Sequence, residues 1–216
     1  MTNSTTTDLK SEVSGEIDSE TRLLAAIAYG EGSTDDIQDE LAGIAHAVVN
    51  RAKAWGDKKV SEVVAADANY TYAANGKCVR FNLLKAASVA QINQSIGMRI
   101  AINAAKEALA GQGTDPSNGA YWWDGIDLKD KKPFNPRIQF GFKYSDPAHN
   151  IFGMPEITKT MIIYWQVKNK KTDKIENSKE RGRFDCVYRS TAAYGKTVFW
   201  RYTPDFVKAT GAKEYK

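Results

Sequence analysis

Hydrophobic residues recur at helical spacing through the first half of the chain. An apolar face predicts a helix from Thr21 to about Tyr29, with Gly30 placed to end it. A second apolar face predicts a well-buried helix from Ile37 to Ala52, and a third helix is expected from about Ile96 to Gly111. Residues 57–92 are mixed and turn-rich, and the pattern assigns them no firm structure.

The pattern becomes typical of strands beyond Ile157. Three segments are rich in β-branched and aromatic residues, and they predict strands over residues 160–168, 183–190 and 196–203. The charged stretch 169–182 between the first two is expected to be a turn. A small antiparallel sheet that follows helices predicts an α+β fold.

The chain is expected to form one domain over residues 19–216. Residues 1–18 are polar, rich in Ser and Thr, and aperiodic, so they predict a disordered leader or the stub of a linker. No apolar run reaches the roughly 18 residues of a membrane span, and the start lacks the basic and apolar regions of a signal peptide. We therefore expect a chain that neither spans a membrane nor uses the general export route.

Charge is distributed unevenly along the 216 residues. Residues 1–156 hold 16 Lys and Arg against 20 Asp and Glu, whereas residues 157–216 hold 14 against 6. A basic C-terminal region favours an anionic polymer, either nucleic acid or an acidic cell-wall glycan, unless it is only a solvated surface.

Several chemistries lack the residues that they need. No glycine-rich phosphate loop occurs, and no nucleophile elbow accompanies a histidine. Zinc would have to be held by His46, Cys78, His149 and Cys186, which show no paired spacing, and His46 is expected on a helix surface. We expect no metal and no cofactor. The two cysteines allow one disulfide in an oxidising compartment.

Paired carboxylates remain as candidate chemistry. Glycoside cleavage needs a carboxylic acid kept protonated by apolar surroundings, and Glu31 follows the apolar run "LLAAIAY". A second acid can act as nucleophile or activate water at roughly 5 to 9.5 Å, and Glu40 is expected on the half-buried rim of the second helix. The alternative is that both acids merely interact with helix dipoles.

Two segments resemble the spore-cortex-lytic type of cell-wall hydrolase. These are "AIAYGEGSTDDIQDELAGIAHAVVNRA", with Glu31 and the pair Asn50-Arg51, and "DPSNGAYWWDG" after the third helix. The resemblance covers about residues 21–125 and implies a lysozyme-like fold in which Glu31 cleaves the β-1,4 bond of peptidoglycan. Gly30 and Gly32 replace the residues that usually flank the acid in that family.

The resemblance leaves the mechanism open. Family members often use one Glu and form an anhydro-sugar, as lytic transglycosylases do, whereas the Glu31–Glu40 spacing is similar to the acid pair of phage-type lysozymes. We expect a muramidase that hydrolyses the bond between N-acetylmuramic acid and N-acetylglucosamine, with Glu31 and Glu40 both catalytic. A lytic transglycosylase, or a non-catalytic module that binds peptidoglycan or nucleic acid, is the alternative.

Aromatic and amide side chains are candidate substrate ligands. Either Trp122 or Trp123 is expected in the core, and the other is expected to line a saccharide cleft with Tyr121. Asn50 and Asn118 are expected to donate hydrogen bonds to N-acetyl groups.

The biological setting follows from the missing signal peptide. A peptidoglycan hydrolase without one resembles the C-terminal lysozyme domain of a type VI secretion effector, a bacteriolytic toxin that acts in the periplasm of a target bacterium. We expect a monomer whose partners are the glycan strand and a cognate immunity protein, with no nucleic acid and no membrane. A phage lysozyme, cytoplasmic until release, is the competing setting.

Overall fold

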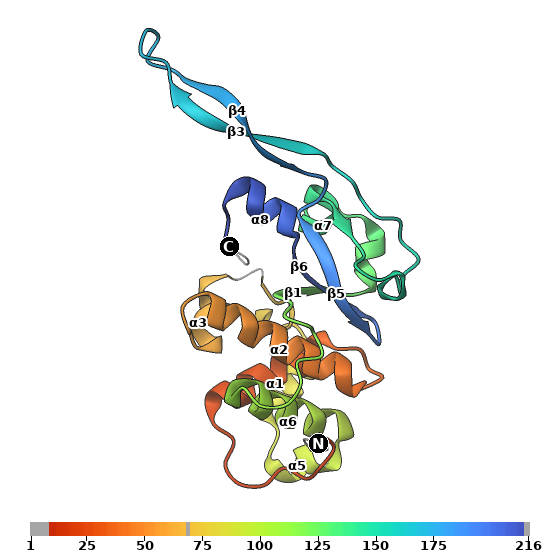
Figure 1. The fold of residues 1–216 in the computed structure, drawn as a ribbon. Coiled ribbons are helices and arrows are strands. Elements are labelled where there is room, and N and C mark those ends of the chain that lie inside the picture. Colours follow the sequence, from red (N-terminus) through yellow and green to blue (C-terminus); the bar gives the residue numbers. More distant parts are fainter. Residues whose placement is uncertain (1–8, 68–69, 214–216) are drawn as a thin grey trace, which may run out of the picture.

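The computed structural model describes residues 9–67 and 70–213, and helices precede strands along the chain (Figure 1). The predicted α+β class is confirmed. The helices of the first half are α1 (Ser19–Glu31), α2 (Gln38–Ala54), α3 (Val60–Ala66), α4 (Val79–Ala86), α5 (Val89–Gln94) and α6 (Ile96–Ala110), with a 3-10 turn, η1 (Ala73–Asn75), before α4.

The strands of the second half form two separate sheets. The larger has the order β1-β6-β5-β2 and comprises β1 (Trp122–Asp124), β2 (Phe142–Lys143), β5 (Tyr188–Tyr194) and β6 (Thr197–Tyr202). Strand β6 pairs antiparallel with both β1 and β5, whereas β2 pairs parallel with β5. The smaller sheet is an antiparallel ribbon of β3 (Met161–Lys168) and β4 (Ile175–Phe184). The remaining elements are η2 (Ile126–Asp130), α7 (Pro136–Phe140), η3 (Pro147–His149) and α8 (Pro204–Thr210).

Helices α1, α2 and α6 form the centre of the helical body. Asp18 caps the start of α1 by accepting a 2.9 Å hydrogen bond from the Thr21 amide. Helix α6 ends at Gly111, which adopts a left-handed conformation with φ of 65°, as the sequence predicts. Residues 24–29 of α1 are all buried. No described helix is both long enough and apolar enough to cross a lipid bilayer.

Strand β6 joins the helical core to a second core. Alternation along the strand sends Phe199 into the helical cluster and Trp200 into a separate cluster with Phe142. The Phe199 ring packs so closely on α2 that a Cβ at Gly43 would lie 2.6 Å from the ring. Helical body and sheet are therefore packed as one unit.

Three parts of the chain differ from the sequence-based expectation. Residues 57–92 contain α3, α4 and the first four residues of α5, and these helices of six to eight residues span too few turns for a clear helical period. Within the predicted leader, Leu9, Val13 and Ile17 are buried against the helical core; residues 1–8 of that leader lie outside the described part. The side chain of Asn93 bonds both backbone groups of Val13, which explains why this polar segment is held.

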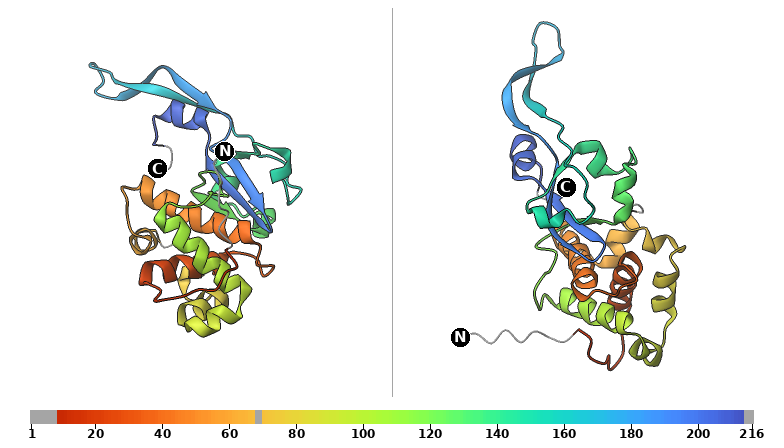
Figure 2. Two further views of the ribbon diagram at one scale, coloured as in Figure 1. Left: turned by 60° about the horizontal axis from the view of Figure 1, so that its bottom comes forward. Right: turned by 90° about the vertical axis from the view of Figure 1, so that its right-hand side faces the viewer.

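The charged stretch 169–182 is largely strand and not turn. Most of it belongs to β4, where charged and polar side chains predominate on an exposed ribbon. This ribbon projects away from the rest of the molecule (Figures 1 and 2).

Cys78 and Cys186 are free thiols, so the disulfide that the sequence allows is not formed.

Candidate functional site

Glu31 is the last residue of α1, so the helix runs one residue beyond the predicted stop at Gly30. Both neighbouring glycines allow close packing around it. A Cβ on Gly30 would lie 2.8 Å from the Ala73 Cβ, and a Cβ on Gly32 would overlap Leu41 Cδ2. Larger residues would push the η1 loop and α2 away from the acid. This steric limit explains why glycine occupies both positions.

The carboxyl group of Glu31 is held mainly through one oxygen. Oε1 accepts hydrogen bonds from the Thr71 hydroxyl at 2.5 Å and the Ala73 amide at 2.6 Å. Oε2 accepts a longer bond of 3.3 Å from the indole Nε1 of Trp123. Glu31 is only half-buried, so solvent reaches it. The shorter bonds fix the carboxyl group, while Oε2 is the less constrained oxygen.

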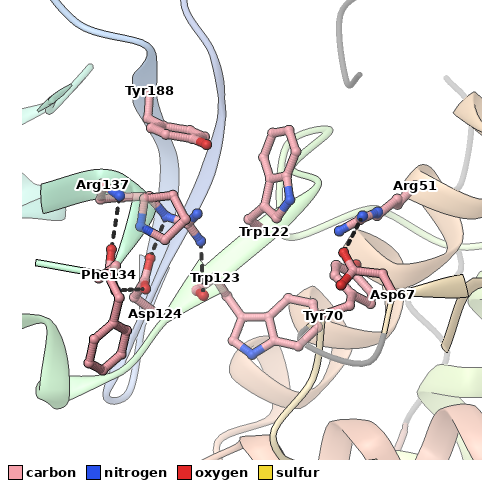
Figure 3. A pocket seen from close by; sticks show the side chains of 11 residues that line it. Arg51, Asp67, Tyr70, Trp122, Trp123, Asp124, Phe134, Arg137 and Tyr188 are labelled. Carbon is pink, nitrogen blue, oxygen red and sulfur yellow. Dashed lines mark hydrogen bonds and ion pairs between the residues drawn. The ribbon is translucent and has the colours of Figure 1, made fainter. Parts of the chain in front are cut away.

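A cleft of about 640 Å³ lies between the helical body and the larger sheet (Figure 3). Glu31 is not itself among the lining residues. Trp123 lies between the two, because its ring lines the cleft while its Nε1 donates to Glu31. Five of the eleven lining residues are aromatic, and one of them, Phe134, is 77% exposed. The lining residues are Arg51, Asp67, Tyr70, Trp122, Trp123, Asp124, Phe134, Asn135, Pro136, Arg137 and Tyr188.

The charges in the cleft are paired. Arg51 Nη2 lies 2.8 Å from Asp67 Oδ2, and Arg137 Nε lies 2.6 Å from Asp124 Oδ2. Burial raises the pKa of Asp124 even though Arg137 and Asn135 hydrogen-bond it. Two guanidinium groups facing two carboxyl groups leave little net charge, which suits a largely uncharged ligand.

Arg51 is held by aromatic rings as well as by its ion pair. Its guanidinium carbon lies 4.1 Å from the centre of the Tyr70 ring and 5.3 Å from that of Trp55. Tyr70 is itself fixed by a 3.1 Å hydrogen bond from its hydroxyl to the Tyr121 carbonyl, and burial raises the pKa of its phenol. Arg51 and Tyr70 are therefore both held by several contacts on this wall of the cleft.

Glu40 does not occupy the predicted half-buried rim: it is completely buried. Oε1 accepts from the Lys196 amide at 3.0 Å and the Thr197 hydroxyl at 2.8 Å, and Oε2 accepts from the Ser33 hydroxyl at 2.5 Å. The expectation placed Glu40 beside the cleft, but the turn between β5 and β6 covers it. A substrate or a water from bulk solvent cannot reach this carboxyl group without opening that turn.

Asn50 is used inside the protein. Its amide nitrogen donates to Asp115 Oδ2 at 2.8 Å and to the Ala120 carbonyl at 3.2 Å, which fixes the loop before β1 on α2. Burial raises the pKa of Asp115, but hydrogen bonds from Ser117, Asn50 and the Gly119 amide outweigh it and leave that pKa lowered. The donor that was expected to bind an N-acetyl group therefore supports a loop instead.

The loop that carries Asn118 is fixed on β5. Asn118 has a left-handed φ of 51°, is exposed, and donates through its side-chain amide to the Thr191 carbonyl at 3.0 Å. This bond, like those of Asn50, uses an amide expected to bind substrate.

His46 is buried beside Asp115 and not on the helix surface, and burial lowers the pKa of its ring.

The aromatic run is divided between the two sides of β1. Trp122 and Trp123 are both half-buried and both line the cleft, so neither is the fully buried core residue that was expected. Trp123 packs on the helical core, and Trp122 packs on the second core. Tyr121 contacts the Trp122 ring edge-on at 5.7 Å between ring centres, but it is not among the cleft-lining residues.

Sequence reasoning missed most of the site. Thr71, Tyr70 and Asp67 come from the segment that was assigned no structure, and Phe134 and Arg137 come from a long proline-containing loop. The aromatic run and the Asn50-Arg51 pair were the only signals that led to this cleft. Within residues 9–67 and 70–213, no cluster of three or more His, Cys, Asp or Glu side chains could hold a metal ion.

Comparison with known proteins finds no matching family model, no matching curated protein and no matching solved structure. The site's function is therefore inferred from its own residues.

Proposed function

We propose that the chain is a peptidoglycan-cleaving glycosidase, in which Glu31 donates a proton to the β-1,4 glycosidic oxygen between N-acetylmuramic acid and N-acetylglucosamine. The observation that carries the proposal is the position of Glu31: a half-buried carboxyl group, anchored through Oε1 and linked by Trp123 to an aromatic cleft. The buried residues of α1 that precede it supply an apolar wall.

The geometry suits proton transfer from Oε2. Protonated Oε2 donates to the leaving oxygen, the bond from C1 to that oxygen breaks, and the carboxylate that remains takes a proton from the group that attacks C1. Meanwhile Thr71 and the Ala73 amide hold Oε1 in place. Sugar rings present C–H faces that pack on aromatic rings such as those of Trp122 and Tyr188.

The burial of Glu40 favours a second form of this function, a lytic transglycosylase that uses Glu31 alone. In a hydrolase a second carboxylate activates water or attacks C1, and Glu40 is enclosed by Ser33, Lys196 and Thr197. In a transglycosylase the substrate's own C6 hydroxyl attacks C1 and returns its proton to Glu31. The product then carries a 1,6-anhydro ring and is one water lighter than the hydrolysis product.

The experiment is digestion of purified peptidoglycan by the wild type and by Glu31→Gln. Loss of turbidity with the wild type only, and fragments identified by mass spectrometry, would support the proposal and distinguish the two forms. Binding without clearing would indicate a non-catalytic peptidoglycan module. Clearing by Glu31→Gln at the wild-type rate would remove Glu31 from the mechanism.

The biological setting is part of the same proposal. A lytic enzyme of this kind suits an antibacterial effector that reaches the periplasm of a target cell and is neutralised in its producer by an immunity protein. A phage lysozyme remains the alternative setting. Protection of the producing cell by a neighbouring gene would separate the two.

A further inference from the structure

The ribbon of β3 and β4 has two very different strands. Strand β3 reads MIIYWQVK, and all of its side chains are exposed except that of Ile163, which is half-buried. Trp165, for example, is 48% exposed. Strand β4 reads IENSKERGRF and carries mainly charged and polar side chains. Apolar character is therefore gathered along one edge of a ribbon that projects from the molecule (Figures 1 and 2).

Strand β4 has the features by which proteins protect an open edge. Between Ile163 and Tyr164, β3 advances one residue while β4 advances two, from Gly182 to Glu180, so the irregularity lies on β4. A second irregularity follows as β4 continues to Asn177. Bulges and charged side chains both oppose pairing with a further strand. In addition, α8 packs on the base of this strand, where a Cβ on Gly182 would lie 2.9 Å from Ala209.

Strand β3 lacks these features apart from Lys168, its last residue. It is regular, and no other described strand pairs with the edge that faces away from β4. Alternate backbone N–H and C=O groups of an antiparallel strand point outward, and here apolar side chains flank them. A long, regular, apolar edge is a template for pairing with another strand.

We propose that β3 pairs antiparallel with β3 of a second copy of this chain, joining two ribbons into a four-stranded sheet. Charge supports a second copy in this orientation. The basic end of the ribbon carries Lys168, Lys170, Lys171 and Lys174. Antiparallel pairing sends the two basic ends about 27 Å apart, the length of eight strand residues, which exceeds the roughly 8 Å screening length in physiological salt.

The same pairing is self-limiting. A two-fold axis through the middle of β3 lets Met161 of one copy approach Lys168 of the other. The same strand edge is then paired in both copies at once. The outer edges of the resulting sheet are the two irregular, charged β4 strands. The assembly therefore stops at a dimer and does not grow into a fibre.

Sedimentation equilibrium of the full chain tests the proposal. Because pairing of one strand buries less than a standard interface, we expect a dimer with a dissociation constant between about 1 µM and 100 µM. The variant Tyr164→Lys/Val167→Lys places each new lysine opposite a glutamate of β4, Glu180 and Glu176, so the ribbon itself is retained. Its dissociation constant should rise at least about tenfold, because each new lysine then lies opposite an apolar residue of the other copy, Trp165 or Ile162, and its charge would lose water there.

The matched control is Thr172→Lys/Ser178→Lys, which adds the same charge to exposed positions outside β3 and should leave the dimer intact. Hydrogen exchange of the wild type gives a second measurement that needs no variant. Amides of residues 161–168 should exchange more slowly at high protein concentration than at low. A monomer at all concentrations up to about 1 mM, larger assemblies, or exchange independent of concentration would overturn the proposal.

Discussion

The surroundings of Glu31 and of Glu40 differ more than their nine-residue separation suggests. Glu31 lies at an accessible helix end, where a loop and the cleft-lining Trp123 hold its carboxyl group. Glu40 is enclosed, and its hydrogen bonds tie α2 to the turn between β5 and β6. Spacing alone suggests a catalytic pair, whereas burial and hydrogen-bond partners distinguish the acid that we propose as proton donor from an acid that is enclosed in the fold.

Glu31→Gln should have the largest effect on activity. Losing the proton donor is expected to lower the rate of peptidoglycan lysis at least about 100-fold, while the melting temperature stays close to that of the wild type. Turbidity assays and thermal melts measure the two quantities. The control is Glu16→Gln, because Glu16 is an exposed acid that precedes the start of α1. This variant should lyse peptidoglycan at the wild-type rate.

Glu40→Gln should show the opposite profile. An amide cannot accept from all three donors, so a buried group is left unsatisfied, at a cost of about 2 kcal/mol in the free energy of unfolding. Denaturant unfolding and the turnover of the folded fraction are the measurements. A near-complete loss of turnover without loss of stability would restore Glu40 to the catalytic pair.

Trp123→Phe tests whether the indole hydrogen bond to Glu31 contributes to turnover. The substitution keeps an aromatic ring on the cleft but removes the indole donor to Oε2, so the carboxyl group is less well oriented. We expect turnover to fall about fivefold to tenfold, equivalent to roughly one hydrogen bond, with little change in KM. An unchanged turnover rate would show that the indole bond has no part in turnover.

Ser33→Ala should have the smallest effect. Ser33 lies in the connection between the two acids, and its hydroxyl bonds only to Glu40 among the described hydrogen bonds. Removing it should lower the free energy of unfolding by about 1 kcal/mol and leave lysis unchanged. A marked fall in lysis with unchanged stability would couple this connection to the active acid.

The sequence predicted what local periodicity encodes. The helices around α1, α2 and α6, and the apolar strands β3 and β6, follow from spacing of hydrophobic residues, and Gly111 ends its helix as expected. The burial of Glu40 could not be predicted in this way. Its place on α2 is visible locally, but the turn that covers it comes from the other end of the chain.

The candidate site, too, could be predicted only where local sequence patterns mark its residues. Arg51 belongs to a signature in the sequence, yet its partners Asp67 and Tyr70 come from a segment without helical or strand period. Thr71 and Ala73 reach Glu31 through that segment as well. Contacts of this type depend on how a loop packs on its neighbours. Such packing produces no periodic pattern of hydrophobic residues in the sequence.

The bond between Glu40 and the Lys196 amide also bears on how the chain reaches its final form. The two residues lie 156 positions apart, and Gly195 in the same turn has a φ of 56° with no room for a Cβ beside Glu40. During synthesis the carboxylate of Glu40 emerges long before Lys196 and Thr197, and its Oε1 stays hydrated until they arrive. Closing this long loop is entropically slow, so the final docking of the β5–β6 turn on α2 belongs to the late steps of folding.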